Sequence, residues 1–493
     1  MPPTPRDARA PSIERRSLLK LAGAAAIGAV SVGAARAAVD ASASAAGSSD
    51  IVDVAVIGAG LSGLTAARDL VRGGCQSVLV LEARDRVGGR TLNFDVGGGF
   101  VSEVGGQWIG PGQTAVADLA RELQVETFPT YFEGRTVAIG GDGRFEIDLH
   151  GTFGTDPALA AKLGAMARDV PSGAPWRSRR VKEFDRLSVG DWLSGQPIKP
   201  EDQNGWDSSI GLSGGVSPAK MGLLHYLSMI NSANCNYDEL DSIKDSAQGT
   251  RFVGGSQILS TKLAQQLGDK VRLSFPIRKI TNWDQGVVTL YSDKGIVRAR
   301  RVVIALSPPL CNQITFEPAL PEGRANLQRA WPAHSPARKT AMVYSRPFWR
   351  QNGLNGHLMQ YGGPIIWAWD NSPPGGEIGI INAFVRNAEL PSDLDEAKRI
   401  QTELYAKAWG DLALSPISYH DRDWGLADPW TLTCISAIPP GFWSAHGPNL
   451  KPACGKLIWS GTETADIWAG YMDGAVRAGR QSALEALNAL RQA

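Results

Sequence analysis

The chain has 493 residues, of which 43% are hydrophobic and 20% are charged, and its formal net charge is +1. A chain of this length is expected to form more than one packed unit, and its near-neutral charge gives no electrostatic support for a nucleic-acid partner. The 5 cysteines and 6 histidines show no spacing typical of a zinc site or a disulfide framework, so no metal is expected.

The first residues of the chain match the layout of an export signal. Arg15-Arg16 precedes a mildly apolar run over residues 21–32, and Ala35-Arg36-Ala37 then offers an Ala-x-Ala cleavage site. The run is too short, and too rich in glycine and alanine, for a good transmembrane helix. We therefore expect a twin-arginine signal peptide over residues 1–37, a linker over residues 38–50, and a periplasmic or secreted protein.

Residues 51–82 have the pattern of a strand, a helix and a second strand. Residues 51–57 form a continuous β-branched run typical of a buried parallel strand. Residues 64–71 place apolar side chains on one helical face, and residues 78–81 form a second apolar run that ends at Glu82. This order predicts a βαβ unit.

Three glycines join the first strand to the helix and indicate a dinucleotide site. Gly58 permits a tight turn, Gly60 lets the backbone approach a pyrophosphate, and Gly63 lets the helix and strand pack closely. The helix N-terminus offers free N–H groups to phosphate oxygens. Glu82, about twenty residues further on, is placed to bind ribose hydroxyls. This fingerprint alone does not separate NAD from FAD.

Similar strand patterns return in the middle and at the end of the chain. Residues 272–277 and 302–306 read as strands with a hairpin between them over residues 287–299. Residues 456–459 read as a strand and precede an Ala-rich helix over residues 473–490. The nucleotide domain is therefore predicted to be discontinuous.

The intervening segments differ in character and are predicted to form a substrate domain. Its first part is helical and polar, and its second part mixes strands, prolines and tryptophans. The predicted order is nucleotide domain 51–130, substrate domain 131–247, nucleotide domain 248–320, substrate domain 321–440 and nucleotide domain 441–493.

The residues after Glu82 favour FAD. Arg84 and Arg90 are suited to phosphate contact and flank a glycine pair that ends at Gly89. The pattern Glu82-Ala-Arg-x-x-x-Gly-Gly-Arg90 resembles the second FAD motif of the flavin-containing amine oxidases, a family that includes the monoamine and polyamine oxidases. The resemblance implies an α/β fold with a discontinuous Rossmann-like FAD-binding domain and an α+β substrate domain.

The resemblance extends over residues 51–489. Residues 103–111, 251–256, 461–465 and 468–475 match further family motifs in the correct order. The cofactor-binding residues that the family pattern implies are Gly58, Gly60, Gly63, Glu82, Arg84, Gly89, Arg90, Gly106, Gln107, Trp108, Ile277, Gly461, Glu463, Tyr471 and Met472.

Two residues are assigned a catalytic role by the same resemblance. Lys339, ten residues before Trp349, aligns with the family lysine that holds a water beside flavin N5. The alternative for Lys339 is an ordinary strand lysine that faces solvent. Tyr471 aligns with one wall of the aromatic cage that orients the amine in monoamine oxidases.

The second wall of that cage departs from the family pattern. Alignment on Asp428-Pro-Trp430 puts Cys434 where monoamine oxidases carry a flavin-linked cysteine, and Ile435 where the second ring would stand. Alignment on Pro439-Pro-Gly441 instead puts Thr433 at the cysteine position and Cys434 at the ring position. Neither register gives a full cage. Noncovalent FAD is favoured, with a covalent link through Cys434 as the alternative.

The resemblance implies oxidation of a primary or secondary amine to an imine, which hydrolyses to an aldehyde or ketone. Trp108, Trp367, Cys434 and Ile435 are candidates for the substrate pocket. The flavin would be reoxidised by O2, which gives H2O2, or by an electron-transfer protein. A homodimer is compatible with the sequence.

Two alternatives remain open. An L-amino-acid oxidase of the same superfamily would need a cation for the substrate carboxylate, for which Arg251, Arg346 and Arg386 are available. A flavin-binding module without oxidase activity would bind the cofactor but would not be reduced by any amine.

Overall fold

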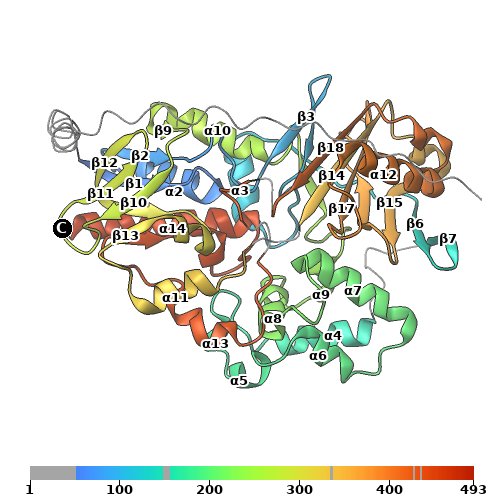
Figure 1. Ribbon diagram of the computed structural model, residues 1–493, viewed down its shortest axis with the longest axis horizontal. Helices are drawn as coiled ribbons and strands as arrows, with labels where there is room; N and C mark the ends of the chain where they lie inside the picture. Colours follow the sequence, from blue (N-terminus) through green and yellow to red (C-terminus); the bar gives the residue numbers. More distant parts are fainter. Residues whose placement is uncertain (1–50, 148–155, 334–336, 426–427, 433–435, 493) are drawn as a thin grey trace, which may run out of the picture. The chain divides into compact units, whose positions relative to one another are not determined.

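The computed structural model describes residues 51–147, 156–333, 337–425, 428–432 and 436–492. The predicted signal peptide and linker lie outside these ranges, as do Thr433, Cys434 and Ile435. Two large sheets with their helices give the predicted α/β fold (Figure 1). Residues 51–493 form one compact unit, so the domain boundaries inside it stay predictions.

The first sheet has eight strands drawn from the beginning, middle and end of the chain. Its central strand, β1, pairs in parallel with β2 on one side, as the βαβ pattern predicts, and with β12 on the other. β19 adds to the far end of β12, also in parallel. The strands are β13 (Thr315–Glu317), β10 (Ile277–Thr281), β11 (Val288–Ser292), β12 (Gly295–Ile304), β1 (Val52–Ile57), β2 (Val78–Leu81), β9 (Val271–Arg272) and β19 (Leu457–Trp459).

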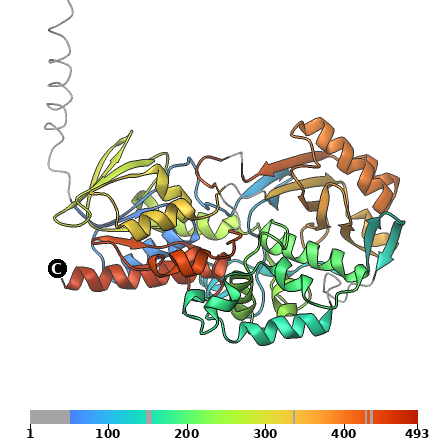
Figure 2. The same cartoon turned by 60° about the horizontal axis from the view of Figure 1, so that its bottom comes forward.

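Helices α2 (Leu61–Arg72) and α14 (Met472–Arg491) pack against each other beside this sheet (Figure 2). Their backbones touch, since a Cβ on Gly479 would lie 2.4 Å from the carbonyl oxygen of Ser62. Only glycine permits this approach. The neighbouring elements are α3 (Thr114–Glu122), α10 (Gln257–Leu267), the β3–β4 pair (Asn93–Gly97, Phe100–Glu103) and the β5–β8 pair (Thr127–Pro129, Thr250–Phe252).

The prediction of one strand over residues 272–277 is wrong, because the segment between the two ends is not in a strand. β9 ends at Arg272 and β10 begins at Ile277. Between them the N–H groups of Ser274 and Phe275 donate to the carbonyl oxygens of Arg84 and Glu82, at 2.7 Å each. Pro276 has no N–H to continue a ladder. The segment therefore crosses the end of β2 and lies beside Glu82.

The second sheet has seven strands and is covered by α12 (Leu394–Trp409). The prediction that residues 131–247 are helical is wrong for their first part, where β6 and β7 form a hairpin and β6 pairs with β15. Three consecutive residues of β6, Thr136 to Ala138, are fully buried in the sheet, and this tertiary contact sets the local structure. The strand order is β18 (Ser418–Asp423), β14 (Arg338–Tyr344), β17 (Gly379–Val385), β16 (Ile365–Asp370), β15 (Leu354–Gln360), β6 (Arg135–Gly140) and β7 (Gly143–Ile147).

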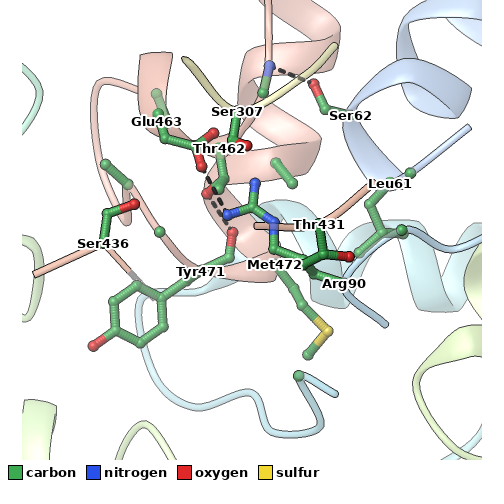
Figure 3. A pocket seen from close by; sticks show the side chains of 18 of the residues that line it. Leu61, Ser62, Arg90, Ser307, Thr431, Ser436, Thr462, Glu463, Tyr471 and Met472 are labelled. Carbon is green, nitrogen blue, oxygen red and sulfur yellow. Dashed lines mark hydrogen bonds and ion pairs between the residues drawn. The ribbon is translucent and has the colours of Figure 1, made fainter. Parts of the chain in front are cut away.

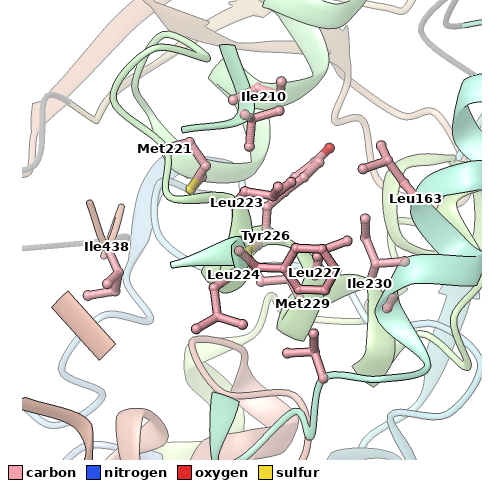
Figure 4. Close-up of a cluster of buried hydrophobic side chains, with 14 of the residues drawn as sticks. Leu163, Ile210, Met221, Leu223, Leu224, Tyr226, Leu227, Met229, Ile230 and Ile438 are labelled. Carbon is pink, nitrogen blue, oxygen red and sulfur yellow. The ribbon is translucent and has the colours of Figure 1, made fainter. Parts of the chain in front are cut away.

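The remaining helices form a region with its own apolar core. Its central helix, α8 (Leu223–Ser232), is buried on nearly every face, and Figure 4 shows Leu224, Tyr226 and Ile230 inside the cluster. A helix that is apolar all round is stable only when other elements enclose it. The others are α4 (Pro157–Ala167), α5 (Val181–Phe184), α6 (Val189–Ser194), α7 (Pro200–Gly214), α9 (Tyr237–Asp241), α11 (Glu322–Ala330) and α13 (Phe442–His446).

Three features of the described residues bear on function. None of their helices is both long and apolar enough to cross a membrane. No group of three or more histidine, cysteine or acidic side chains among them could hold a metal ion. Their cysteines are free thiols: Cys75, Cys235, Cys311 and Cys454.

Two buried histidines make the stability of this fold sensitive to acid. Burial lowers the pKa of His357 and of His225 to about 4. His357 is held as a neutral ring, because Trp367 donates to its Nδ1 at 3.1 Å and Nε2 lies 3.3 Å from the carbonyl oxygen of Tyr131. Since the unfolded chain protonates these rings first, stability is fully present above about pH 6.5 and is lost as the pH falls toward 4.

We expect the thermal midpoint to fall when the pH is lowered from 7 to 5, with each histidine contributing up to about 3 kcal/mol at full titration. His357→Gln should lower the midpoint at every pH, because hydrogen bonds are lost, and should make its pH dependence shallower. The control is His446→Gln, which changes a partly exposed ring. Equal pH slopes for wild type and His357→Gln would contradict this account.

Candidate active site

The glycine loop between β1 and α2 is shaped to receive an anion. A Cβ on Gly63 would lie 2.0 Å from the carbonyl oxygen of Gly58, so helix and loop can meet only at a glycine. Gly60 is the N-cap of α2 and contributes no side-chain cap. The N–H groups of the first helical turn therefore have no intrahelical partner and point toward the cavity described below.

Glu82 is fixed at the end of β2, beside this loop. The residue is 3% exposed, and its Oε2 accepts a hydrogen bond of 2.7 Å from the Ala59 N–H. Its Oε1 accepts one of 3.0 Å from the Arg84 N–H. Oε1 also accepts a weak hydrogen bond of 3.4 Å from the Arg84 guanidinium, whereas Oε2 keeps a further acceptor site. The group can therefore still accept a hydroxyl donor of a ribose.

The two predicted phosphate-binding arginines are engaged differently. Arg84 donates to Asp428 Oδ2 at 2.8 Å and to Thr431 Oγ1 at 2.6 Å, so its guanidinium holds the 428–432 segment against the cavity. Arg90 donates to Glu463 Oε1 at 2.7 Å (Figure 3). Both arginines line the cavity. Their contact with FAD stays a prediction.

Glu463 shows that this wall can accept a further donor. The residue is buried, and its Oε2 has no hydrogen-bond partner among the described residues. Gly461, two residues earlier, donates its N–H to the Ser62 Oγ at 3.0 Å, which ties this segment to α2. A buried carboxylate oxygen without a partner, beside a glycine loop, can accept a hydrogen bond from a hydroxyl group of a bound dinucleotide.

Lys339 and Gln107 meet, although 232 positions separate them in the sequence. Lys339 lies on β14, is 1% exposed, and donates to Gln107 Oε1 and, at 3.1 Å, to the carbonyl oxygen of Gly105. Its Nζ lies 5.0 Å from the ring centroid of Trp369 and 5.3 Å from that of Trp108. This excludes the solvent-facing alternative for Lys339. The ammonium lies behind the cavity wall, in contact with the lining residues Gln107 and Gly105.

The two predicted pocket tryptophans form one aromatic wall. Trp108 and Trp367 stack with their centroids 5.5 Å apart, and Trp369 packs against both. Gln107, beside Trp108, donates to Asn371 Oδ1 at 2.8 Å. The wall is therefore rigid, since its polar edge is held by buried hydrogen bonds.

Tyr471 stands at the start of α14, and burial raises its pKa above the ordinary value. Its backbone oxygen accepts a hydrogen bond of 2.7 Å from the Thr462 hydroxyl, which holds the main chain at the start of α14. Ser436, the first described residue after Cys434 and Ile435, also lines the cavity, and Trp331 Nε1 donates to its Oγ at 2.9 Å. Figure 3 shows both Ser436 and Tyr471 in this wall.

One continuous cavity joins all these features. Its empty space, with the opening to solvent, is about 2690 Å3. Of the predicted site residues that are described, only Gly63 and Lys339 are absent from its lining, because Gly63 packs inside the loop and Lys339 lies behind Gln107. Ile277 lines the end near Glu82, and Gly106 lies against the Met472 side chain.

The sequence analysis missed the part of the lining that comes from the helical region. This part includes Trp176, His225, Asp241, Trp331 and Trp443. Burial raises the pKa of Asp241 to about 7. No motif marks these residues, since they reach the cavity only through the packing of several helices. The residues described thus fit FAD: glycine loop, ribose acid and arginine at one end, and an aromatic chamber at the other.

A comparison with protein families supports this assignment. Residues 61–487 match the family model described as flavin containing amine oxidoreductase. AofH of Mycobacterium tuberculosis, classed with the flavin-containing monoamine oxidases, is 36% identical over 446 residues, which is 88% of this chain and 96% of AofH. Putrescine oxidase of Kocuria rosea is 34% identical over 471 residues, which is 89% of this chain and 95% of that protein.

Solved structures give the same result. Cyclohexylamine oxidase from Brevibacterium oxydans superposes with a TM-score of 0.82 at 30% identity, over 90% of this chain and 100% of that one. These matches confirm the predicted fold class, the cofactor FAD and the class of reaction. The chain belongs to the flavin-containing amine oxidoreductase family and is an FAD-dependent enzyme that oxidises amines.

Proposed function

We propose that the protein oxidises a small primary or secondary amine to an imine, which water converts to an aldehyde or ketone. The observation that carries the proposal is the single cavity that runs from the Gly58–Glu82 end to Tyr471 and the tryptophans. FAD bound there supplies a two-electron acceptor. The chain supplies a largely apolar chamber and a buried ring that orient the amine. Putrescine oxidase and cyclohexylamine oxidase are named for amines of this size.

The amino-acid oxidase alternative lacks a cation for the substrate carboxylate. Arg251 donates to Glu103 at 2.9 Å and to two backbone carbonyl oxygens, and Arg386 donates to the Ile365 carbonyl oxygen at 3.0 Å. Arg346 is exposed. Within the described chain none of the three lines the cavity, which favours an amine without a carboxylate.

The proposal is tested by mixing the oxidised holoprotein with a panel of amines in the absence of oxygen. We expect amines to bleach the flavin absorbance at about 450 nm, because a cofactor that accepts hydride is reducible by its substrate. The matching free amino acids should not bleach it. Bleaching by amino acids alone would favour the L-amino-acid oxidase alternative. No bleaching with any amine would favour the flavin-binding module.

Lys339 is proposed as a positioning residue that places positive charge behind Gln107. Reduction of O2 adds negative charge, so Lys339→Met should slow reoxidation of the reduced protein about 10- to 100-fold while changing reduction by the amine much less. Stopped-flow absorbance separates the two half-reactions. Lys279→Met, which removes a half-exposed strand lysine paired with Glu317, is the matched control. Equal slowing of both half-reactions in Lys339→Met would indicate that the lysine is merely structural. Slow reoxidation of the wild-type protein by O2 would favour an electron-transfer protein as the acceptor.

We further propose that FAD is held noncovalently and that the protein is exported by the twin-arginine route. Both proposals rest on residues outside the described ranges, namely Cys434 and the arginine pair within residues 1–37. Intact-mass measurement of the acid-denatured protein from a periplasmic fraction tests both. The expected mass is that of the chain without flavin and without residues 1–37. Flavin retained on the protein would show a covalent link, and a full-length mass would contradict cleavage.

A further inference from the structure

The substrate half of the cavity contains one carboxyl group that the reaction as described does not use. Among the described lining residues, Glu82, Arg84, Arg90 and Glu463 belong to the nucleotide half. The lining from the helical region and from the aromatic wall is apolar or neutral apart from Asp241, since burial lowers the pKa of the nearby His225 to about 4 and leaves that ring neutral.

Asp241 is buried without a cation. It ends helix α9, is 3% exposed, and accepts hydrogen bonds from Tyr237 at 3.2 Å and, weakly, from Ser213 at 3.4 Å. No lysine, arginine or histidine among the described residues forms an ion pair with it. A buried carboxylate that has only neutral partners is costly, and a cation that enters beside it removes part of that cost.

The fold around α9 does not need this carboxylate. The helix is capped by the Asn236 side chain, and the backbone carbonyl oxygen of Glu239 accepts the Ala247 N–H at 2.9 Å. The hydroxyls of Tyr226 and Tyr237 both meet Ser209 Oγ, so they have partners without Asp241. An amide could keep both contacts, since its oxygen can accept from one hydroxyl and its NH2 group can donate to the oxygen of the other. These two hydrogen bonds therefore do not require the negative charge.

The charge of Asp241 acts at the reaction end of the cavity. Its proximity contributes to the raised pKa of Tyr471, the residue assigned to the cage. Asp241 and Tyr471 both line the same cavity and lie within electrostatic reach of each other. A substrate oriented by Tyr471 at one end can place its other end near Asp241.

We propose that Asp241 binds a second, protonated nitrogen of the substrate, so that the enzyme prefers diamines over monoamines of equal chain length. The inference rests on the proposed function and names the substrate class for that site. The nitrogen that is oxidised must lose its proton, whereas the distal one keeps its charge and pairs with the carboxylate. No group is transferred to Asp241, and its role is to position and select the substrate.

The first test compares three linear substrates of equal length: a diaminoalkane, an alkylamine and an amino alcohol. We expect kcat/KM for the diamine to exceed both others by about 30-fold or more, since breaking a buried charge pair costs at least this much. Asp241→Asn should collapse the diamine-to-monoamine ratio toward one. Asp238→Asn, on the exposed side of the same helix, is the matched control and should keep the ratio.

The second test measures binding without turnover. A diamine whose amino-bearing carbons carry two methyl groups each, and no hydrogen, cannot be oxidised, and its affinity can be measured by calorimetry against the matching monoamine. Because burial raises the pKa of Asp241 to about 7, the diamine advantage should grow as the pH rises through 7. Burial keeps the pKa values of the neighbouring Tyr226, Tyr237 and Tyr471 above their ordinary range, so these three groups stay neutral there. The remaining acidic neighbour is Asp238.

The outcomes separate this inference from the proposed function. Two results with the wild-type enzyme would overturn the role of Asp241, even if Asp241→Asn does not fold. One is a kcat/KM for the amino alcohol equal to that for the diamine. The other is no advantage of the diamine over the monoamine in turnover or binding. An equal loss for all amines in Asp241→Asn would show a structural role. Failure of every amine to bleach the flavin would instead reject the proposed function, while the binding comparison would still decide the fate of Asp241.

Discussion

The site depends on the backbone contact between the helices α2 and α14. Gly479 lies against the carbonyl oxygen of Ser62, where any larger residue would force the two helices apart. The hydroxyl of Ser62 meets that of Ser460 at 2.7 Å and accepts the Gly461 N–H. This contact brings Glu463 and Tyr471, near the end of the chain, beside the glycine loop near its beginning. The parallel pairing of β19 with β12 supports the same arrangement.

Charge is distributed unevenly along that cavity, and the distribution matches the two ends of the chemistry. At the nucleotide end, Arg84 and Arg90 are held by acids, so their donors are oriented before a phosphate arrives. At the substrate end, aromatic rings and neutral hydroxyls line the wall, which lowers the effective dielectric constant. A single charge such as that of Asp241 therefore has a larger effect there than it would at the surface.

The sequence marked most of the cavity lining at the glycine-loop end and little of the lining that comes from the helical region, for a physical reason. Gly58, Gly60 and Glu82 act through local backbone geometry, which leaves a pattern at fixed spacing. The strand break at residues 273–276 was missed because it depends on hydrogen bonds to Glu82 and Arg84, far away in the sequence. The hairpin of β6 and β7 was missed because its strands are stabilised by pairing with β15.

By itself the sequence determined the cofactor, the class of reaction and the family, since the long motifs at both ends of the chain encode local turns and charged contacts. Only the tertiary structure decided which side chains face the amine. It placed Lys339 behind Gln107 rather than in the wall, and it brought Ser436 and Asp241 to the cavity. Burial and pairing arise from contacts between distant segments, so no local pattern in the chain could have revealed them.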